Sequence, residues 1–211
     1  MRRILSMLMT ALLVLTVAAC GNTEGAGSSP KKPAAEKVAE TVPTPAPSGV
    51  GKEALVVYFS CTGNTKALAQ SMAELAKADI FEIQPVQPYT AEDLNYNDET
   101  TRATVEQKND AARPEIKNRI ENFGQYKTVI IAYPIWWGLA PRIMDTFMES
   151  YDFSGKTVLP VCTSGSSDIG SSADYLKELT AGAEWKPGRR FGANASRTEL
   201  EALLKETGIL P

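Results

Sequence analysis

The feature that most constrains the fold of this sequence is an alternation between short apolar runs and amphipathic segments. Three runs are almost continuously apolar and rich in β-branched residues: "ALVVYF" at 54–59, "TVIIAY" at 128–133 and "TVLPVC" at 157–162. Such runs are typical of strands buried on both faces of a parallel sheet. Because helical patterns lie between them, the sequence predicts an α/β fold, with helices on both faces of the sheet and right-handed crossovers.

Three segments have the spacing of an amphipathic helix, in which residues three and four apart share a face. Pro141 opens the second segment, and residues 196–199 begin the third with the pattern of a capping box. The apolar stripes are Leu68, Met72 and Leu75; Ile143, Met144, Phe147, Met148 and Tyr151; and Leu200, Leu203 and Leu204.

The remaining parts of the folded region give weaker signals. Further strands fit "IFEI" at 80–83 and "RRF" at 189–191. Because proline cannot donate a backbone hydrogen bond, Pro160 is expected to distort the third apolar run locally. Residues 90–118 are polar, and we interpret them as helix fragments and loop rather than as a second domain.

Composition excludes several classes of function. The chain has 211 residues, 43% of them hydrophobic, which suits one globular domain. Its formal charge of −3 gives none of the basic surface typical of nucleic-acid binding, so no nucleic-acid partner is expected. The sequence contains no histidine, which excludes Ser-His-Asp and Cys-His catalysis and removes the commonest ligand of zinc and copper.

Residues 1–20 have the pattern of a secretory signal peptide, with Arg2 and Arg3 before a short apolar run and small residues at its end. A transmembrane helix is the alternative, but the run is shorter than the roughly 20 apolar residues that span a bilayer. The ending "VAAC" resembles the lipobox of bacterial lipoproteins, which implies that Cys20 is lipidated and that the mature protein is anchored to a membrane outside the cytoplasm. Residues 21–52, rich in Pro, Ala, Ser and Thr, are expected to form a disordered tether before a domain at 53–211.

The first unusual loop is "SCTGNT" at 60–65, which directly follows the first apolar run and opens a helical pattern. Backbone N–H groups, hydroxyls and the positive end of a helix dipole can together bind a phosphate without a lysine. The loop matches neither the P-loop motif nor the dinucleotide fingerprint. Alternatively, its Ser, Thr and Gly residues only cap a helix and form a turn.

The second unusual loop is "YPIWWG" at 133–138, after the second apolar run. Consecutive residues of an extended chain face opposite ways, so at least one of Trp136 and Trp137 should be exposed. A flat aromatic ring at the end of a strand suits stacking on a planar ligand, although both tryptophans could be ordinary packing residues. The sequence does not indicate which of the two would stack.

The third unusual loop, "TSGSSDIG" at 163–170, follows the third apolar run. Its small residues would allow a ligand to approach the backbone closely, and its hydroxyls and amides could bind the ligand's polar edge. Clusters of Gly and Ser are also common in loops that bind nothing.

Taken together, the three loops resemble those of the flavodoxin family. The family's phosphate loop has the form S/T-x-T-G-x-T, which Ser60, Thr62, Gly63 and Thr65 match in full, and the similarity extends over residues 54–210. The resemblance implies a flavodoxin-like, doubly wound, five-stranded parallel sheet of order 2-1-3-4-5 that binds FMN. The phosphate would lie on the first loop, and the isoalloxazine ring would lie between the second and third. The implied cofactor-binding residues are Ser60, Cys61, Thr62, Gly63, Asn64, Thr65, Pro134, Ile135, Trp136, Trp137, Gly138, Thr163, Ser164, Gly165 and Ser166.

The expected strand order also bears on the two cysteines of the domain. Cys61 and Cys162 would follow or end strands that are not neighbours, which favours two free thiols over a disulfide. Cys61 would lie at a helix N-terminus, where thiol pKa values fall, but the chain has no histidine to act as its base.

Two features differ from the family's electron carriers, which are usually strongly acidic around the flavin. Residues 51–211 carry 17 Lys and Arg against 22 Asp and Glu, and the third loop has no aromatic residue. Both argue against a soluble shuttle. We therefore expect a membrane-tethered FMN protein that exchanges electrons with a redox partner protein or a small acceptor. The alternatives are an NAD(P)H- or quinone-linked FMN oxidoreductase and a non-catalytic module for another phosphorylated ligand.

Overall fold

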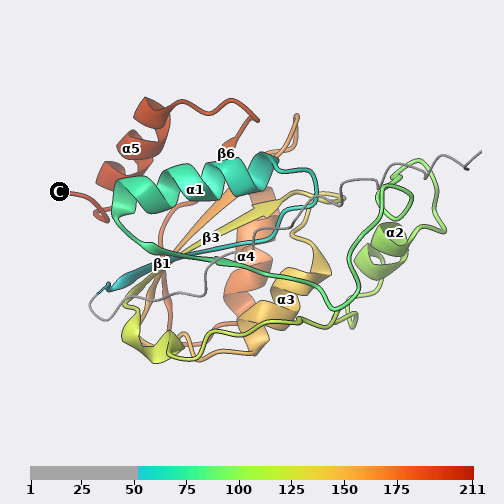
Figure 1. Ribbon diagram of the computed structural model, residues 1–211, viewed down its shortest axis with the longest axis horizontal. Coiled ribbons are helices and arrows are strands. Elements are labelled where there is room, and N and C mark those ends of the chain that lie inside the picture. Colours follow the sequence, from blue (N-terminus) through green and yellow to red (C-terminus); the bar gives the residue numbers. More distant parts are fainter. Residues whose placement is uncertain (1–51) are drawn as a thin grey trace, which may run out of the picture. The chain divides into compact units, whose positions relative to one another are not determined.

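The computed structural model describes residues 52–211, which form a parallel sheet with helices on both faces (Figure 1). The predicted signal peptide, its Cys20 and all but the last residue of the predicted tether lie outside the described residues. The elements are β1 (Ala54–Tyr58), α1 (Asn64–Ala76), β2 (Asp79–Glu82), α2 (Arg102–Gln107), a 3-10 turn (Phe123–Gln125), β3 (Thr128–Pro134), α3 (Arg142–Glu149), β4 (Thr157–Thr163), α4 (Gly170–Glu178), β5 (Glu184–Trp185), β6 (Arg189–Phe191) and α5 (Arg197–Glu206).

The sheet has the strand order β2-β1-β3-β4-β5, with every pairing parallel. This order confirms the predicted 2-1-3-4-5 topology. The fifth position consists of two short segments, because β6 also pairs in parallel with β4, further along that strand than β5 does. The predicted strand at "RRF" is thus β6, and the one at "IFEI" begins one residue earlier, as β2.

Alternate residues of the central strands enter two separate cores. In β1, Leu55 and Val57 pack on the face covered by α3 and α4, whereas Val56 and Tyr58 pack on the face covered by α1 and α5 (Figure 1). All four are almost completely buried. This double burial explains why the strand sequences are continuously apolar rather than alternating.

Pro160 affects the neighbouring strand rather than its own. The predicted distortion of residues 157–162 was wrong, because β4 pairs with β3 at all seven of its positions. The backbone of Pro160 faces the fifth strand position, where its carbonyl oxygen lies 2.6 Å from the point that a Cβ on Gly188 would occupy. Neither Pro160 nor Pro187, which lies in the gap itself, has an N–H to donate, and the fifth strand is interrupted between β5 and β6.

The helix predictions hold in outline. Leu68 and Met72 of α1 are buried, as are Leu200, Leu203 and Leu204 of α5, and Ser196 and Glu199 form the predicted capping box. Four members of the second stripe are buried in α3, while Tyr151 lies just beyond its end. Helix α4 was not predicted, because "GSSADYLKE" begins with residues that favour turns. Residues 90–118 contain one short helix, α2, among turns, which confirms the interpretation of this connection.

Candidate functional site

The three unusual loops lie at one edge of the sheet, because they follow β1, β3 and β4, which are neighbours in the parallel order. Thr163, at the end of β4, links all three. Its hydroxyl oxygen lies 2.7 Å from that of Thr65, and its carbonyl accepts a hydrogen bond from the Ile135 N–H at 3.0 Å. Thr65 and Thr163 are buried, so their hydroxyl contact fixes the loops to one another.

The first loop turns sharply into α1 at Gly63, whose φ of 90° lies in the left-handed region that favours glycine. The Gly63 N–H donates to the Ser60 hydroxyl at 3.1 Å, which closes the turn. Cys61, Thr62 and Asn64 are exposed. Ser60 therefore shapes the loop, while Thr62 can contact a ligand.

The N-terminus of α1 is open. No side chain caps it, and its first turn contains no acidic residue. The backbone N–H groups of Asn64, Thr65 and Lys66 have no acceptor among residues 52–211. Unpaired N–H groups at a helix N-terminus, together with the helix dipole, form a binding site for an anion.

The second loop is a tight two-residue turn. Trp136 and Leu139 exchange backbone hydrogen bonds at 2.9 and 3.0 Å across Trp137 and Gly138, whose φ angles are 47° and 82°. Positive φ at both central positions is the signature of a type I′ turn. A tryptophan is strained there, at a cost of order 1–3 kcal/mol, and such strain persists chiefly where a functional site needs it.

The turn gives the two tryptophans different surroundings. The ring of Trp136 packs edge-on against Phe59, with centroids 5.7 Å apart, and against Tyr89, with centroids 5.2 Å apart. Trp137 lies at the tip of the turn and is 42% exposed. The prediction that at least one tryptophan is exposed is confirmed, and Trp137 is the more exposed of the two rings.

A cavity of about 480 Å³ opens between the first two loops. Cys61, Thr62 and Thr65 line it on one side, and Pro134, Ile135, Trp136 and Trp137 line it on another; Leu94, Tyr96 and Ala103 complete it. Most of this wall is apolar, and the N-terminus of α1 adjoins it. A cavity of this kind suits a ligand with a flat apolar part and an anionic group.

The last three cavity residues come from the connection 90–118, which the sequence analysis did not assign to the site. One signal could have identified two of them, because Leu94 and Tyr96 are isolated apolar residues within the otherwise polar "TAEDLNYNDETT". Tyr96 is 73% exposed, so its ring is accessible from solvent as well as lining the cavity.

The third loop contributes less to this cavity than the sequence suggested. Ser164, Gly165 and Ser166 are not among the residues that line it. The Ser164 carbonyl accepts a hydrogen bond from the Arg190 guanidinium at 3.2 Å, and the Ser166 N–H donates to the Ser164 hydroxyl at 3.3 Å. Their contact with a cofactor stays a prediction.

Both cysteines of the described region are free, as predicted; Cys61 is exposed and Cys162 is buried. Desolvation raises the pKa of the Cys61 thiol to about 12, although the charge of Arg102 lowers it. Burial likewise raises the pKa of the Cys162 thiol to about 12. Neither thiol is therefore poised to act as a nucleophilic thiolate at neutral pH.

Comparison with known proteins now identifies the family. The sequence profile described as "Flavodoxin" matches residues 53–207, most of the chain. The chain belongs to the flavodoxin family. Among curated proteins, none matches it.

Solved structures resemble this flavodoxin-family chain at two levels. A protein from Bacteroides eggerthii DSM 20697, assigned as a flavoprotein, shares 42% identity over 74% of this chain and 98% of its own, with a TM-score of 0.71. A similarly assigned protein from Bacteroides uniformis ATCC 8492 shares 42% identity over 74% and 99%, with a TM-score of 0.70. A flavoprotein from Lactobacillus acidophilus NCFM, solved in complex with FMN, shares 20% identity over 66% and 93%, with a TM-score of 0.53, which shows the common fold.

Residues 52–211 contain neither a candidate membrane-spanning helix nor a candidate metal site. No helix in this range is long and apolar enough to cross a membrane. No group of three or more Cys, Asp or Glu side chains in the same range could hold a metal ion.

Proposed function

We propose that this flavodoxin-family protein binds FMN in the cavity between the first two loops and exchanges electrons through it. The observation that carries the proposal is the open N-terminus of α1 beside an apolar cavity whose wall includes the exposed Trp137. The N–H groups of α1 and the Thr62 hydroxyl would hold the phosphate, and the tryptophan turn would contact the ring. When bound, FMN supplies one- and two-electron redox chemistry.

Each part of the cavity has a separate task in this proposal. The N–H groups at the N-terminus of α1 would bind the phosphate dianion without a cationic side chain. Because riboflavin lacks this phosphate, the protein would bind FMN more tightly than riboflavin. The apolar wall excludes water from the ring, which makes added negative charge on the ring costlier. The buried contact between Thr65 and Thr163 keeps the phosphate loop and the tryptophan turn at a fixed separation.

The absorption spectrum of the purified protein, with FMN added if none is retained, tests the proposal. We expect the bands of a bound flavin and a stoichiometry of one FMN per chain. Titration of apoprotein should also give tighter binding of FMN than of riboflavin. Absence of any spectral change on titration with FMN would contradict the proposal, and anaerobic bleaching by NAD(P)H would identify a nicotinamide as the electron donor.

We also propose that the protein is a lipoprotein anchored to a membrane outside the cytoplasm through Cys20. The support is the sequence "VAAC" after a basic and apolar leader, followed by 31 residues rich in Pro, Ala, Ser and Thr before the first described residue. Labelling with a radioactive fatty acid should mark the wild type and leave Cys20→Ser unlabelled. A wild-type protein that takes up no label would contradict this anchoring.

A further inference from the structure

The connection 90–118 reaches the candidate FMN cavity from outside the three predicted loops. Leu94, Tyr96 and Ala103 line the same cavity as Trp137. Tyr96 is 73% exposed, while the third loop has no aromatic residue with which to cover a flat ring. An exposed tyrosine in the wall of an apolar cavity would bury its ring on a planar ligand.

The connection is attached to the tryptophan turn, residues 136–139, at two points. The first point is Tyr89, which directly precedes the connection. The Arg102 guanidinium lies 4.0 Å from the centroid of the Tyr89 ring, and its Nε is 2.7 Å from a Glu106 carboxylate oxygen. The Tyr89 hydroxyl donates to the other oxygen of Glu106. Because the Tyr89 ring also packs on Trp136, α2 and the turn form one packed unit.

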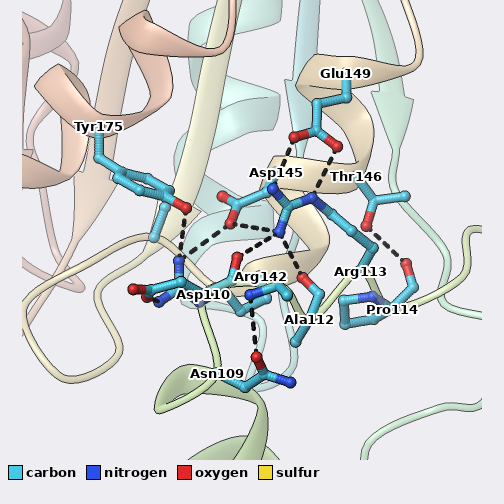
Figure 2. Close-up of polar contacts among 12 residues, drawn as sticks. Asn109, Asp110, Ala112, Arg113, Pro114, Arg142, Asp145, Thr146, Glu149 and Tyr175 are labelled. Atoms are coloured by element: carbon cyan, nitrogen blue, oxygen red, sulfur yellow. Dashed lines mark hydrogen bonds and ion pairs between the residues drawn. The ribbon is translucent and has the colours of Figure 1, made fainter.

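The second point is Arg142, in the first turn of α3, whose polar contacts are drawn in Figure 2. Arg142 is only 2% exposed. Its guanidinium donates to the Gln107 carbonyl at 3.0 Å and contacts the Asp110 carboxylate. The Gln107 side chain in turn donates to the Ala140 carbonyl at 3.0 Å. These bonds join the end of α2 to the segment that leads from the tryptophan turn into α3.

The cluster around Arg142 contains a buried carboxylate and several buried polar atoms that lack a hydrogen-bond partner in the described region. Asp145 is completely buried, 3.3 Å from Arg142, and burial raises its pKa to about 6 although Arg142 and Arg113 both lower it. One oxygen of Asp145, Nε of Arg142 and Oε1 of Gln107 are buried without a hydrogen-bond partner in the described region. Buried ion pairs often stabilise a fold no better than apolar residues of similar size. We therefore interpret the cluster by the contact that it makes, which joins the end of α2 to the segment before α3.

We propose that the connection 90–118 is the third wall of the flavin site, with Tyr96 contacting the ring system, and that Arg142 is the positioning residue that holds this wall against the tryptophan turn. This inference rests on the proposed binding of FMN. Tyr96 of the connection would thus cover the flavin ring, because the third loop has no aromatic residue to do so.

Variants of Tyr96 test the contact, with dissociation constants for FMN and riboflavin measured by titration of apoprotein. Tyr96→Ala should weaken both flavins by the same factor, about three- to tenfold, because one aromatic contact is lost and the phosphate contacts remain. Tyr96→Phe keeps the ring and should bind as the wild type does. Val105→Ala, at an exposed position of α2 outside the cavity wall, is the matched control.

Variants of Arg142 test the positioning role. The double variant Arg142→Met/Asp145→Leu removes both buried charges, so the fold should survive. If the wall then lies in its binding position only about a tenth of the time, both flavins should bind about tenfold more weakly. Arg142→Lys keeps the charge but not the paired donors, and should fall between this variant and the wild type. Arg189→Met, which breaks the exposed ion pair with Glu206, should change neither affinity.

The outcomes separate this inference from the function on which it rests. If wild-type protein binds no FMN, the proposed function fails. If it binds FMN but Tyr96→Ala binds both flavins as tightly as the wild type, the third wall is wrong. A folded Arg142 double variant with wild-type affinities would show that Arg142 is only structural; if that variant does not fold, wild-type affinities in Arg142→Lys would overturn the positioning role.

Discussion

Helices α1 and α5 lie on the same face of the sheet but have different N-termini. Both follow a strand and pack on the same face of the sheet (Figure 1), but Gly63 precedes α1 whereas Ser196 precedes α5. At α5, the Ser196 hydroxyl accepts from the Glu199 N–H while the Glu199 carboxylate accepts from the Ser196 N–H. At α1 no side chain performs this task, and the first N–H groups stay without an acceptor in the described region.

The difference shows how a protein keeps a binding site available. A capped N-terminus is stabilised by its own side chains, whereas an open one keeps its donors for a ligand at some cost to the free protein. The same contrast separates the two tryptophans, because Trp136 packs on Phe59 and Tyr89 while Trp137 projects from a strained turn. The N–H groups at the start of α1 and the ring of Trp137 should therefore control flavin binding. The cap of α5 and the ring of Trp136 should control stability.

The largest expected effect concerns the open end of α1. Thr62→Ala should weaken FMN binding by about tenfold or more, since a hydrogen bond to a charged group contributes roughly 1.5–3 kcal/mol. Riboflavin, which lacks the phosphate, should bind almost unchanged, and Thr62→Ser should restore FMN binding. Thr65→Ala should also weaken FMN, with an added loss from its contact with Thr163. Isothermal titration of both flavins measures these effects; equal losses for the two would refute the phosphate assignment.

A comparable effect, on the free energy of unfolding alone, is expected at Gly188, which lies beside Pro160 of β4. A Cβ on Gly188 would lie 2.6 Å from the Pro160 carbonyl oxygen, so Gly188→Ala should lower the free energy of unfolding by about 1–3 kcal/mol. Gly165→Ala, which meets nothing within 4 Å, should leave stability unchanged. Urea denaturation measures both. If Gly165→Ala instead weakens flavin binding, the third loop contacts the cofactor, as the sequence predicted.

The two tryptophans should differ in a redox titration. A ring stacked on the flavin disfavours added negative charge, so Trp137→Ala should raise the potential of the second electron by about 40–90 mV, equivalent to about 1–2 kcal/mol. Trp136→Ala should chiefly lower the unfolding free energy, because that ring packs on Phe59 and Tyr89. Unchanged potentials in both variants under anaerobic titration would mean that neither ring stacks on the flavin.

The smallest expected effect concerns the capped end of α5. Ser196→Ala should lower the free energy of unfolding by about 1 kcal/mol, because the N-terminal N–H groups of α5 lose their acceptor. Flavin affinity should not change, since the cap lies outside the cavity wall. Thermal unfolding and an FMN titration of the same variant measure the two quantities. A loss of FMN affinity there would show that the contrast between the two helices is not one between binding and stability.

The sequence by itself was sufficient for the central strands and the first two loops, whereas the strand order came only with the resemblance to the flavodoxin family. Residues buried on both faces of a parallel strand must be apolar at every position, so "ALVVYF" and "TVIIAY" were recognisable without neighbours. The pattern around Gly63 and the resemblance that it carries indicated a phosphate loop, and the capping box at Ser196 was found because its two partners are three residues apart. Each of these signals depends on residues that are close together in the chain, so it can be recognised from the sequence alone.

Only the tertiary structure decided which groups remain available to a ligand. Thr65 and Thr163 are 98 residues apart, and the contact between their hydroxyls links the first loop to the end of β4. Trp137, rather than Trp136, became the exposed ring because Tyr89 packs on its neighbour. Tyr96 lines the cavity from the connection 90–118, which also contacts Arg142 through Gln107 and Asp110. Each of these results depends on contacts between distant segments, which periodicity and motif spacing do not encode.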